Sequence, residues 1–211
     1  APYYRVAQRL GARTGGPVTW ERDCLFVRRF DRIATGGGHV ERLGVESLCS
    51  LAGVSEFGAS TPKETLAAAL ARFATDPAAE LRELLLRDVL DVAMGNTDNH
   101  ARNTAVLKRA DGRIELTPLY DFAPMVLDPQ GIARVCRWHA ESGGFPDWSR
   151  VAETLGKLGM DVASTKEWLR KLAPRVSALP AIMHEEHVPM GVTAAIEARA
   201  RIVASALAEV R

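Results

Sequence analysis

The sequence lacks the features of disulfide-stabilised, zinc-binding and membrane-spanning proteins. Its 211 residues include only three cysteines, which are far apart in the chain: Cys24, Cys49 and Cys136. An odd number of cysteines at these spacings gives neither a disulfide framework nor a C-x-x-C zinc site, so we expect buried, reduced thiols and a cytoplasmic location. No apolar run approaches the roughly 20 residues that span a membrane, and the first residues lack a basic and then apolar export signal. We therefore expect no membrane contact.

The chain also lacks an excess of either charge. Its 27 Lys and Arg residues nearly balance 26 Asp and Glu residues, which gives a formal net charge of +1. This balance gives no global electrostatic reason to expect nucleic-acid binding, although it is compatible with a local basic patch. With 47% hydrophobic and 25% charged residues, the composition is that of one globular domain with a substantial core.

The most informative stretch runs from Gly95 to Asp121 and reads G-N-T-D-N-H-A-R-N-T-A-V-L-K-R-A-D-G-R-I-E-L-T-P-L-Y-D. A polar loop follows an apolar helix and holds Asp98, His100 and Asn103. Two strands, 104–108 and 113–117, are expected next, because Asp111-Gly112 is a typical hairpin turn. We expect the hairpin to return Asp121 to the neighbourhood of the loop.

These residue types suit phosphoryl transfer. A kinase needs a carboxylate that accepts the proton of the attacking hydroxyl, and it needs oxygen ligands for magnesium. Asp98 precedes Asn103 by five positions, as the base precedes the metal-binding Asn in protein-kinase catalytic loops, and Asp121 follows a short hairpin as the second metal-binding Asp does. We therefore predict Asp98 as the base, with Asn103 and Asp121 as magnesium ligands.

An ordinary turn is the alternative for this stretch. The His-Arg-Asp and Asp-Phe-Gly strings of common kinases are absent, and Asn96-Thr97-Asp98 and Asp121-Phe122-Ala123 stand in their places. Asn and Asp are also frequent turn formers. Three oxygen donors on one helix-loop-hairpin unit nevertheless favour a chemical site.

The motif G-N-T-D-N-H-A-R-N followed by L-T-P-L-Y-D resembles the HipA-like serine/threonine kinases, the toxin members of bacterial toxin–antitoxin pairs. Three other stretches are similar to the same family. Tyr3 to Gly11 resembles the helix before its hinge, Val27 to Arg32 its hinge strand and F-D-R, and Met190 to Arg211 its final helix. The resemblance covers nearly the whole chain.

The resemblance implies roles for individual residues. Asp98 matches the catalytic aspartate, and Asn103 and Asp121 match the magnesium ligands. The hinge backbone that holds adenine is matched by Arg28, Arg29 and Phe30, and two further motif positions with supporting roles are matched by His100 and Tyr120.

The resemblance also implies a domain organisation. The family's amino-terminal lobe, with its phosphate-covering loop and phosphate-binding lysine, would lie before Ala1. Residues 1–32 then form a helix and hinge strands that border that lobe. Residues 33–211 form a helical lobe like the large C-terminal lobe of protein kinases, with the catalytic loop at 95–121. The fragment alone is expected to be catalytically incomplete.

The implied reaction is transfer of the ATP γ-phosphoryl group to a protein serine or threonine, with ATP and Mg²⁺ as cofactors. By analogy with the family, the protein substrate is a translation component such as an aminoacyl-tRNA synthetase, and the partner is a HipB-like antitoxin. Two alternatives stay open. The first is a non-catalytic, kinase-like module that binds an antitoxin or other partner, and the second is a metal-dependent phosphohydrolase in which Asp98 activates water.

Periodicity and capping signals predict a mainly α-helical, α+β chain with small β-hairpins. We expect a helix at 2–10 ended by Gly11, two strands within 18–30, and a helix at 40–52 ended by Gly53. The run Gly36 to Gly38 lacks the lysine and the spaced glycines of a phosphate loop and is expected in a surface loop.

Later helices begin at typical capping residues. Thr61-Pro62 and Asp76-Pro77 are expected to start two helices, the second covering about 78–94, and Asp147 and Ser164 to start two more before a last helix at 192–210. In helix 78–94, a solvated face is expected to carry the acidic residues Glu80, Glu83, Asp88 and Asp91.

Two polar clusters allow alternatives. A phosphate, an acidic substrate or RNA could be recognised by Arg134, Arg137 and Trp138, or the arginines could pair with carboxylates such as Asp128 while Trp138 packs in the core. His184 and His187 are three residues apart, which permits a metal pair, but an exposed polar helix end is the stronger interpretation.

Overall fold

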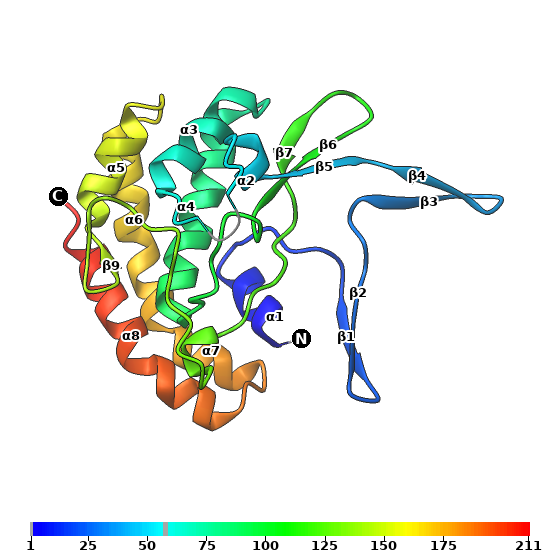
Figure 1. Cartoon of the computed structure of the whole chain (residues 1–211). Helices are drawn as coiled ribbons and strands as arrows, with labels where there is room; N and C mark the ends of the chain where they lie inside the picture. Colours follow the sequence, from blue (N-terminus) through cyan, green and yellow to red (C-terminus); the bar gives the residue numbers. More distant parts are fainter. Residues whose placement is uncertain (1, 57–58) are drawn as a thin grey trace.

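The computed structural model describes residues 2–56 and 59–211 as a helical body from which two β-hairpins project (Figure 1). The helices are α1 (Pro2–Arg9), α2 (Leu48–Leu51), α3 (Lys63–Phe73), α4 (Pro77–Met94), α5 (Trp148–Gly156), α6 (Val162–Ser177), α7 (Leu179–Glu185) and α8 (Met190–Ala208), with a 3₁₀ turn, η1, at Met125–Leu127. The predicted α+β class with small antiparallel hairpins is confirmed. No helix in the described ranges is long and apolar enough to cross a membrane.

In the described part of the chain, four small antiparallel sheets accompany the helices. Their strands are β1 (Val18–Glu21) with β2 (Cys24–Val27), β3 (Arg32–Gly36) with β4 (His39–Arg42), β5 (Gly44–Ser47) with β6 (Ala105–Lys108) and β7 (Ile114–Leu116), and β8 (Glu141–Ser142) with β9 (Phe145–Pro146). The β1–β2 and β3–β4 hairpins extend away from the body (Figure 1). The predicted strand pairs within 18–30 and 104–117 are confirmed, and Gly37 and Gly38 lie in the turn between β3 and β4.

Helix α4 lies inside the body and packs against α3 and α8. Its start is confirmed, since the Asp76 side chain accepts a hydrogen bond from Ala79 N at 3.1 Å and Pro77 takes the first helical position. Its apolar residues are almost completely buried: Leu81, Leu84, Leu85, Val89, Leu90 and Val92. Because neighbours surround α4 from Glu83 to Met94, the helix has no solvated face beyond its first turns.

The predicted solvated face of α4 is therefore wrong: Glu80, Glu83, Asp88 and Asp91 are all buried. Two of these carboxylates, Glu80 and Glu83, bind the segment before β1, and Glu80 also binds the end of β7. Glu80 accepts a hydrogen bond from Leu116 N at 2.7 Å and pairs with Arg13 at 3.0 Å. Glu83 accepts hydrogen bonds from Arg13 N and Arg87 Nε, and Arg87 donates to Thr117 O at 2.6 Å. Carboxylates in the first half of α4 thus fix the hairpin that leads to Asp121.

The third acidic residue, Asp88, is the centre of a buried ion-pair network. Its Oδ1 lies 3.0 Å from Lys63 Nζ and 3.0 Å from Arg134 Nη2, and its Oδ2 accepts a hydrogen bond from Trp138 Nε1 at 2.6 Å. Burial alone would raise the pKa of Asp88, but the two cations outweigh it and hold that pKa below its ordinary value. For Arg134 and Trp138 the packing alternative is correct, with Asp88 and Glu141 as partners in place of Asp128.

Residues 40–52 do not form one helix. They form β4, β5 and the short α2, because β5 pairs with β6 from Gly44 opposite Lys108 to Ser47 opposite Ala105. This pairing joins positions about sixty residues apart, and helical periodicity within 40–52 does not report it.

Three local details also differ from the predictions. Pro62 rather than Thr61 precedes α3, without a side-chain cap, and Asp161 rather than Ser164 caps α6, accepting a hydrogen bond from Ser164 N at 2.7 Å. Cys24 is exposed, whereas Cys49 and Cys136 are buried as expected. At His184 and His187 the structure agrees with the preferred interpretation, since both lie exposed at the polar end of α7; Glu186, directly after this helix, pairs with Arg5 of α1 at 2.7 Å.

Replacing Asp88 should destabilise the fold far more than replacing an exposed carboxylate. Asp88→Ala leaves Lys63 and Arg134 buried without their shared counter-charge, which we expect to cost about 3–5 kcal/mol of unfolding free energy. Glu167→Ala, which removes the exposed pair with Lys171, should cost less than about 1 kcal/mol. Urea unfolding of both variants measures the difference, and equal costs would contradict the central position of Asp88.

Candidate functional site

The loop that holds Asp98 begins where α4 ends. Gly95 caps the helix in the left-handed conformation, with φ of +68°. Asn96 then donates from its backbone N to Asp91 O and from Nδ2 to Asp91 Oδ1, both at 2.8 Å. Asn99 Nδ2 donates to Cys136 O at 2.8 Å. Two buried amides therefore fix the inner side of the loop to the body.

Asn96, Asn99 and Asp91 were missed as site residues by sequence reasoning. The available signal in the sequence was the presence of two asparagines, Asn96 and Asn99, in the same short loop as Asp98; the structure shows that both asparagines are buried and that Asp98 is more exposed. The partner of Asn96 is Asp91 on α4, and the partner of Asn99 is the carbonyl of Cys136. The sequence motif alone does not identify these partners.

Asp98, His100 and Asn103 are brought together on the outer side of the loop. The side chain of Asp98 is 36% exposed, and its Oδ1 lies 3.8 Å from His100 Nε2. Asn103 Nδ2 donates to Asp98 O at 2.9 Å, and Asn103 N donates to His100 O at 2.9 Å. Because its amide nitrogen is used within the loop, Asn103 can offer its Oδ1 to a ligand.

Tyr120 connects this loop with residues 28–30. Its hydroxyl donates to Arg102 O, and its ring centroid lies 5.8 Å from that of Phe30. Burial raises the pKa of Tyr120 to about 12, so the phenol stays a neutral donor at physiological pH. The next residue, Asp121, is exposed and has φ of +51°, a strained value for a residue other than glycine. No described contact joins Asp121 directly to Asp98 or Asn103.

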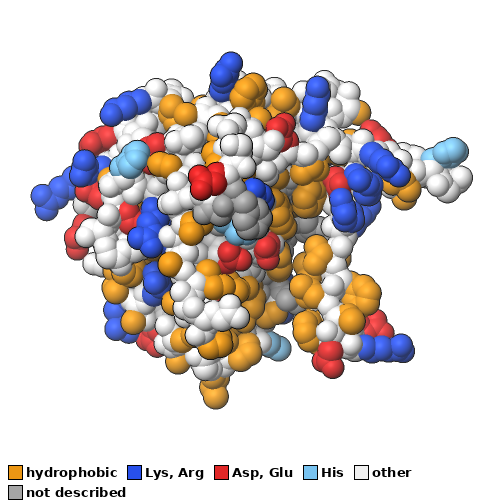
Figure 2. Space-filling view, viewed as in Figure 1, with side chains coloured by type: hydrophobic (Ala, Val, Ile, Leu, Met, Phe, Trp, Pro, Cys, Tyr) orange, Lys and Arg blue, Asp and Glu red, His pale blue; other side chains and the backbone are white. Residues whose placement is uncertain are grey.

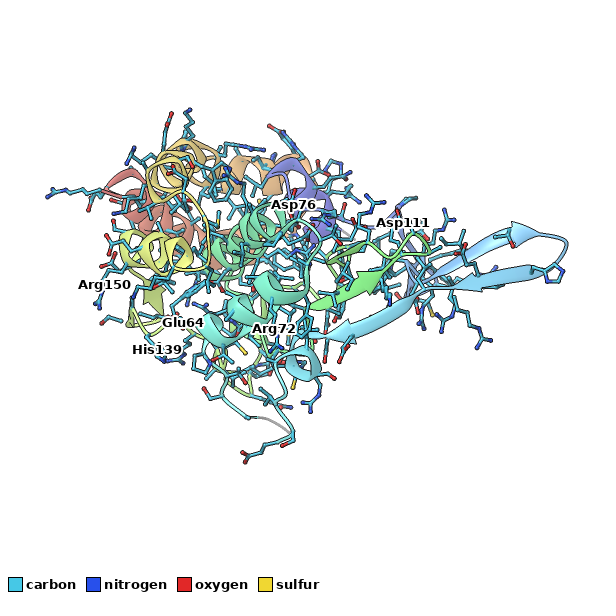
Figure 3. The ribbon with its side chains drawn as sticks, turned by 90° about the horizontal axis from the view of Figure 1, so that it is seen from above. Glu64, Arg72, Asp76, Asp111, His139 and Arg150 are labelled. Atoms are coloured by element: carbon cyan, nitrogen blue, oxygen red, sulfur yellow. The ribbon has the colours of Figure 1, made fainter. Side chains whose placement is uncertain are left out.

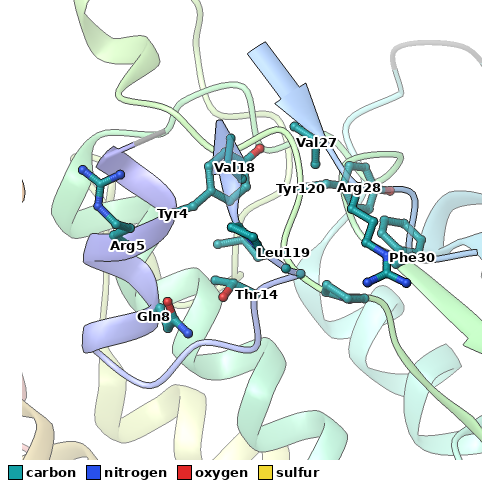
Figure 4. Close-up of a pocket in the computed structure, with 14 residues that line it drawn as sticks. Tyr4, Arg5, Gln8, Thr14, Val18, Val27, Arg28, Phe30, Leu119 and Tyr120 are labelled. Carbon is teal, nitrogen blue, oxygen red and sulfur yellow. The ribbon is translucent and has the colours of Figure 1, made fainter. Parts of the chain in front are cut away.

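A cavity of about 410 Å³ lies beside Tyr120 (Figure 4). Its walls come from α1, the β1–β2 hairpin and the segment before Asp121, and its lining includes Tyr4, Val18, Val27, Arg28, Phe30 and Tyr120. Arg28 and Phe30, two of the predicted hinge residues, line this cavity, and their role in holding adenine stays a prediction. Arg29 does not line it, because its guanidinium pairs with Asp31 at 2.6 Å. Asp98, Asn103 and Asp121 do not line this cavity.

The donor set is compatible with magnesium held against a nucleotide. Among the described residues, no group of three or more His, Cys, Asp and Glu side chains could hold a metal ion by itself. Mg²⁺ bound with nucleotides typically uses one or two protein carboxylates, and phosphates and water complete its coordination. Asn103 and Asp121 supply oxygen donors of this kind, so they remain the predicted ligands.

Gly95 should tolerate substitution less well than a glycine of similar φ elsewhere. A Cβ at Gly95 would lie 2.5 Å from Val126 Cγ1, whereas a Cβ at Gly112, with φ of +87°, would meet nothing within 4 Å. Both Gly95→Ala and Gly112→Ala should lose about 1–2 kcal/mol to the left-handed backbone, and only Gly95→Ala should lose more through the clash. Thermal unfolding measures both costs. Adding Val126→Ala should recover part of the Gly95→Ala loss, and equal losses in the two glycine variants would contradict this packing.

Comparison with known proteins identifies relatives of the chain. The family model described as HipA-like C-terminal domain matches residues 1–180. The protein named "Putative kinase Y4mE" from Sinorhizobium fredii is 31% identical over 114 residues, which are 51% of this chain and 27% of that protein.

A solved structure of a HipA protein has a similar fold. The structure of the toxin–antitoxin system HipA, HipB and operator DNA complex from Shewanella oneidensis contains a chain that matches with a TM-score of 0.73 and 19% identity. The match covers 97% of this chain and 54% of that chain, so our chain spans about half the length of its solved neighbour. Because the family model matches most of its residues, the chain belongs to the HipA-like C-terminal domain family.

Proposed function

We propose that the chain is the larger, catalytic lobe of a HipA-like serine/threonine protein kinase, which transfers the ATP γ-phosphoryl group to a protein hydroxyl. The observation that carries the proposal is the geometry of the loop at 95–103. It presents a partly exposed Asp98 and an Asn103 whose side chain donates a hydrogen bond to the Asp98 carbonyl. Kinase catalysis needs this pair of side-chain types, a base and a metal ligand, on one rigid loop.

Asp98 would accept the proton of the attacking serine or threonine hydroxyl. Its carboxylate lies at the surface of the loop, where a substrate side chain can approach it, and its Oδ1 lies 3.8 Å from His100 Nε2. The buried amides of Asn96 and Asn99 keep the loop in place while Asp98 stays accessible. Correct positioning of a base is one of the main contributions a kinase makes to phosphoryl transfer.

The nucleotide would bind between the cavity and the loop. Phe30 and Tyr120 provide aromatic surface for adenine, and Arg28 lies at the same cavity (Figure 4). Tyr120 also contacts the loop through Arg102 O, so it lies between the adenine side and the phosphate side of the site. Bound Mg-ATP would supply the phosphoryl group and its neutralising cation, with Asn103 and Asp121 as protein ligands.

The biological setting would be that of a toxin–antitoxin pair. A HipB-like antitoxin is the proposed partner, because the solved neighbour forms a complex with HipB and operator DNA. The proposed substrate is a translation component such as an aminoacyl-tRNA synthetase, and this choice rests on the family resemblance alone.

One observation favours a second candidate, a binding module without catalysis. The predicted catalytic and metal-binding residues do not line the cavity, so nucleotide binding and catalysis are not joined within this chain by a single closed pocket. The solved neighbour is also nearly twice as long as the matched region. Experiments on both the chain and its complete parent therefore distinguish the two candidates.

Asp98→Asn in the complete parent should remove phosphoryl transfer and keep nucleotide binding. General-base catalysis contributes about 10²–10⁴-fold, so the rate of protein phosphorylation should fall by at least that range. This rate is measured as the transfer of label from ATP to the purified partner proteins. Asp111→Asn, at the turn between β6 and β7 (Figure 3), serves as the matched control because this carboxylate is exposed and belongs to the hairpin turn rather than to the loop at 95–103. Unchanged transfer by Asp98→Asn would refute the assignment, and release of free phosphate without labelled protein would favour hydrolysis.

Calorimetric titration with Mg-ATP tests the proposed nucleotide site directly. We expect saturable binding that Asp121→Gly weakens at least tenfold, because the variant loses the metal ligand. Glycine tolerates the φ of +51° at this position, so the backbone should keep its conformation. Binding by the complete parent that is insensitive to Asp121→Gly would contradict the proposed metal site. Binding by neither protein would favour the non-catalytic module.

A further inference from the structure

Asp91 lies in the last turn of α4, directly beneath the loop that carries Asp98. It is 8% exposed. Its backbone carbonyl accepts a hydrogen bond from Asn96 N, and its Oδ1 accepts one from Asn96 Nδ2, both at 2.8 Å. The first residue of the loop after Gly95 is therefore held twice by the same aspartate.

Asp91 is a surplus carboxylate in the buried ion-pair network. Lys63 and Arg134 both contact Asp88 Oδ1 at 3.0 Å, and Arg134 Nη1 also lies 3.3 Å from Glu141 Oε2. Two buried cations thus already face two carboxylates. Within the described ranges Asp91 forms no ion pair, so its ionisation would add a buried charge without a partner, which is costly.

Asn96 has an unused acceptor beside Asp91. Its Oδ1 is buried and has no hydrogen-bond partner among the described residues, although buried polar atoms are normally bonded. A primary amide has a donor and an acceptor side by side. A carboxylic acid in its neutral form offers the complementary acceptor and donor. A neutral Asp91 can satisfy both groups of Asn96, whereas an ionised Asp91 can satisfy only the nitrogen.

We propose that Asp91 is a positioning residue for the loop, which as a neutral acid accepts a hydrogen bond from Asn96 Nδ2 and donates its own proton to Asn96 Oδ1. Ionisation of Asp91 removes the second hydrogen bond and loosens the loop. The effect on phosphoryl transfer rests on the proposed function, but the hydrogen bonds themselves do not depend on it.

The environment of Asp91 places this change near neutral pH. Burial, together with the smaller effect of Asp88 in the preceding turn of α4, raises the pKa of Asp91 to about 6. Lys63 from α3, the Asn96 amide and Arg134 act in the opposite direction. Since this pKa lies above that of an unfolded aspartate, the stabilisation by Asp91 is complete at low pH and is lost as the pH rises through about 6.

Nuclear magnetic resonance of the protein with ¹³C-labelled aspartate and ¹⁵N-labelled asparagine tests the proposal without nucleotide or substrate. The Asp91 carboxyl resonance should titrate with a midpoint between about pH 5 and pH 7, and the Asn96 side-chain amide should shift with the same midpoint. An Asp91 carboxyl that stays ionised throughout this range, or an Asn96 amide that does not follow it, would overturn the proposal. The titration uses the wild-type protein alone, and its resonances can be assigned with protein labelled with ²H, ¹³C and ¹⁵N.

Asp91→Asn provides a permanently neutral counterpart. An asparagine at this position can accept from Asn96 Nδ2 and donate to Asn96 Oδ1 at every pH. Hydrogen exchange of peptides covering 95–103, corrected for the intrinsic effect of pH, should show about fivefold lower protection at pH 8 than at pH 5.5 in the wild type, as expected for one lost hydrogen bond. Protection in Asp91→Asn should be independent of pH. The same pH profile in both proteins would overturn the proposal.

Asp91→Ala and Asp111→Asn complete the comparison. Asp91→Ala removes both side-chain hydrogen bonds and should give low protection of 95–103 at both pH values, whereas Asp111→Asn should keep the wild-type profile. Wild-type protection in Asp91→Ala would refute the role of Asp91. Failure of the complete parent to phosphorylate protein would refute the proposed function and leave these measurements unaffected.

Discussion

The shared contact of Lys63 and Arg134 with Asp88 is the constraint on which the rest of the structure depends. It joins α3, α4 and the segment before β8 at one buried point, and Trp138 completes the set of donors to the carboxylate. Buried ion pairs often add little net stability compared with apolar packing, because desolvation offsets the attraction. Their value here is geometric: Lys63, Arg134 and Asp88 are all buried, and the carboxylate of Asp88 contacts both cations, so the pairing fixes how the three segments meet.

Helix α4 connects the two halves of the candidate site. Carboxylates in its first half bind Arg13 and the end of β7, so they fix the chain that leads into the cavity and the chain that leads to Asp121. In its second half, Asp91 binds Asn96 and Asp88 binds Arg134. Arg134 lies in the same segment as Cys136, whose carbonyl accepts the hydrogen bond from Asn99. One helix therefore helps to set the positions of the cavity, the loop and the hairpin relative to one another, in addition to the contacts that Tyr120 makes with Arg102 O and Phe30.

Sequence reasoning succeeded where structure is determined locally. Three features depend only on neighbours in the chain: the turn at Asp111-Gly112, the helix start at Asp76-Pro77 and the five-residue interval from Asp98 to Asn103. The structure contains the turn and the helix start, and Asn103 donates a hydrogen bond to the Asp98 carbonyl. It failed where partners are distant. The burial of Asp88 depends on Trp138, fifty positions away, and strand β5 depends on β6. The roles of Asp98, Asn103 and Asp121 in chemistry stay predictions, because geometry alone does not measure reactivity.

The two projecting hairpins also affect how the chain behaves in solution. Hydrophobic side chains gather on the surface of the projecting part of the molecule (Figure 2). In the β1–β2 hairpin, Trp20 is 62% exposed, Phe26 56% and Leu25 44%, and each hairpin is a two-stranded sheet with unpaired outer edges. Apolar edge strands are templates for pairing with other chains. A net charge of +1 provides almost no repulsion between molecules. The exposed apolar edge of β1–β2 is therefore the surface through which we expect this chain to self-associate at high concentration, unless another surface covers it.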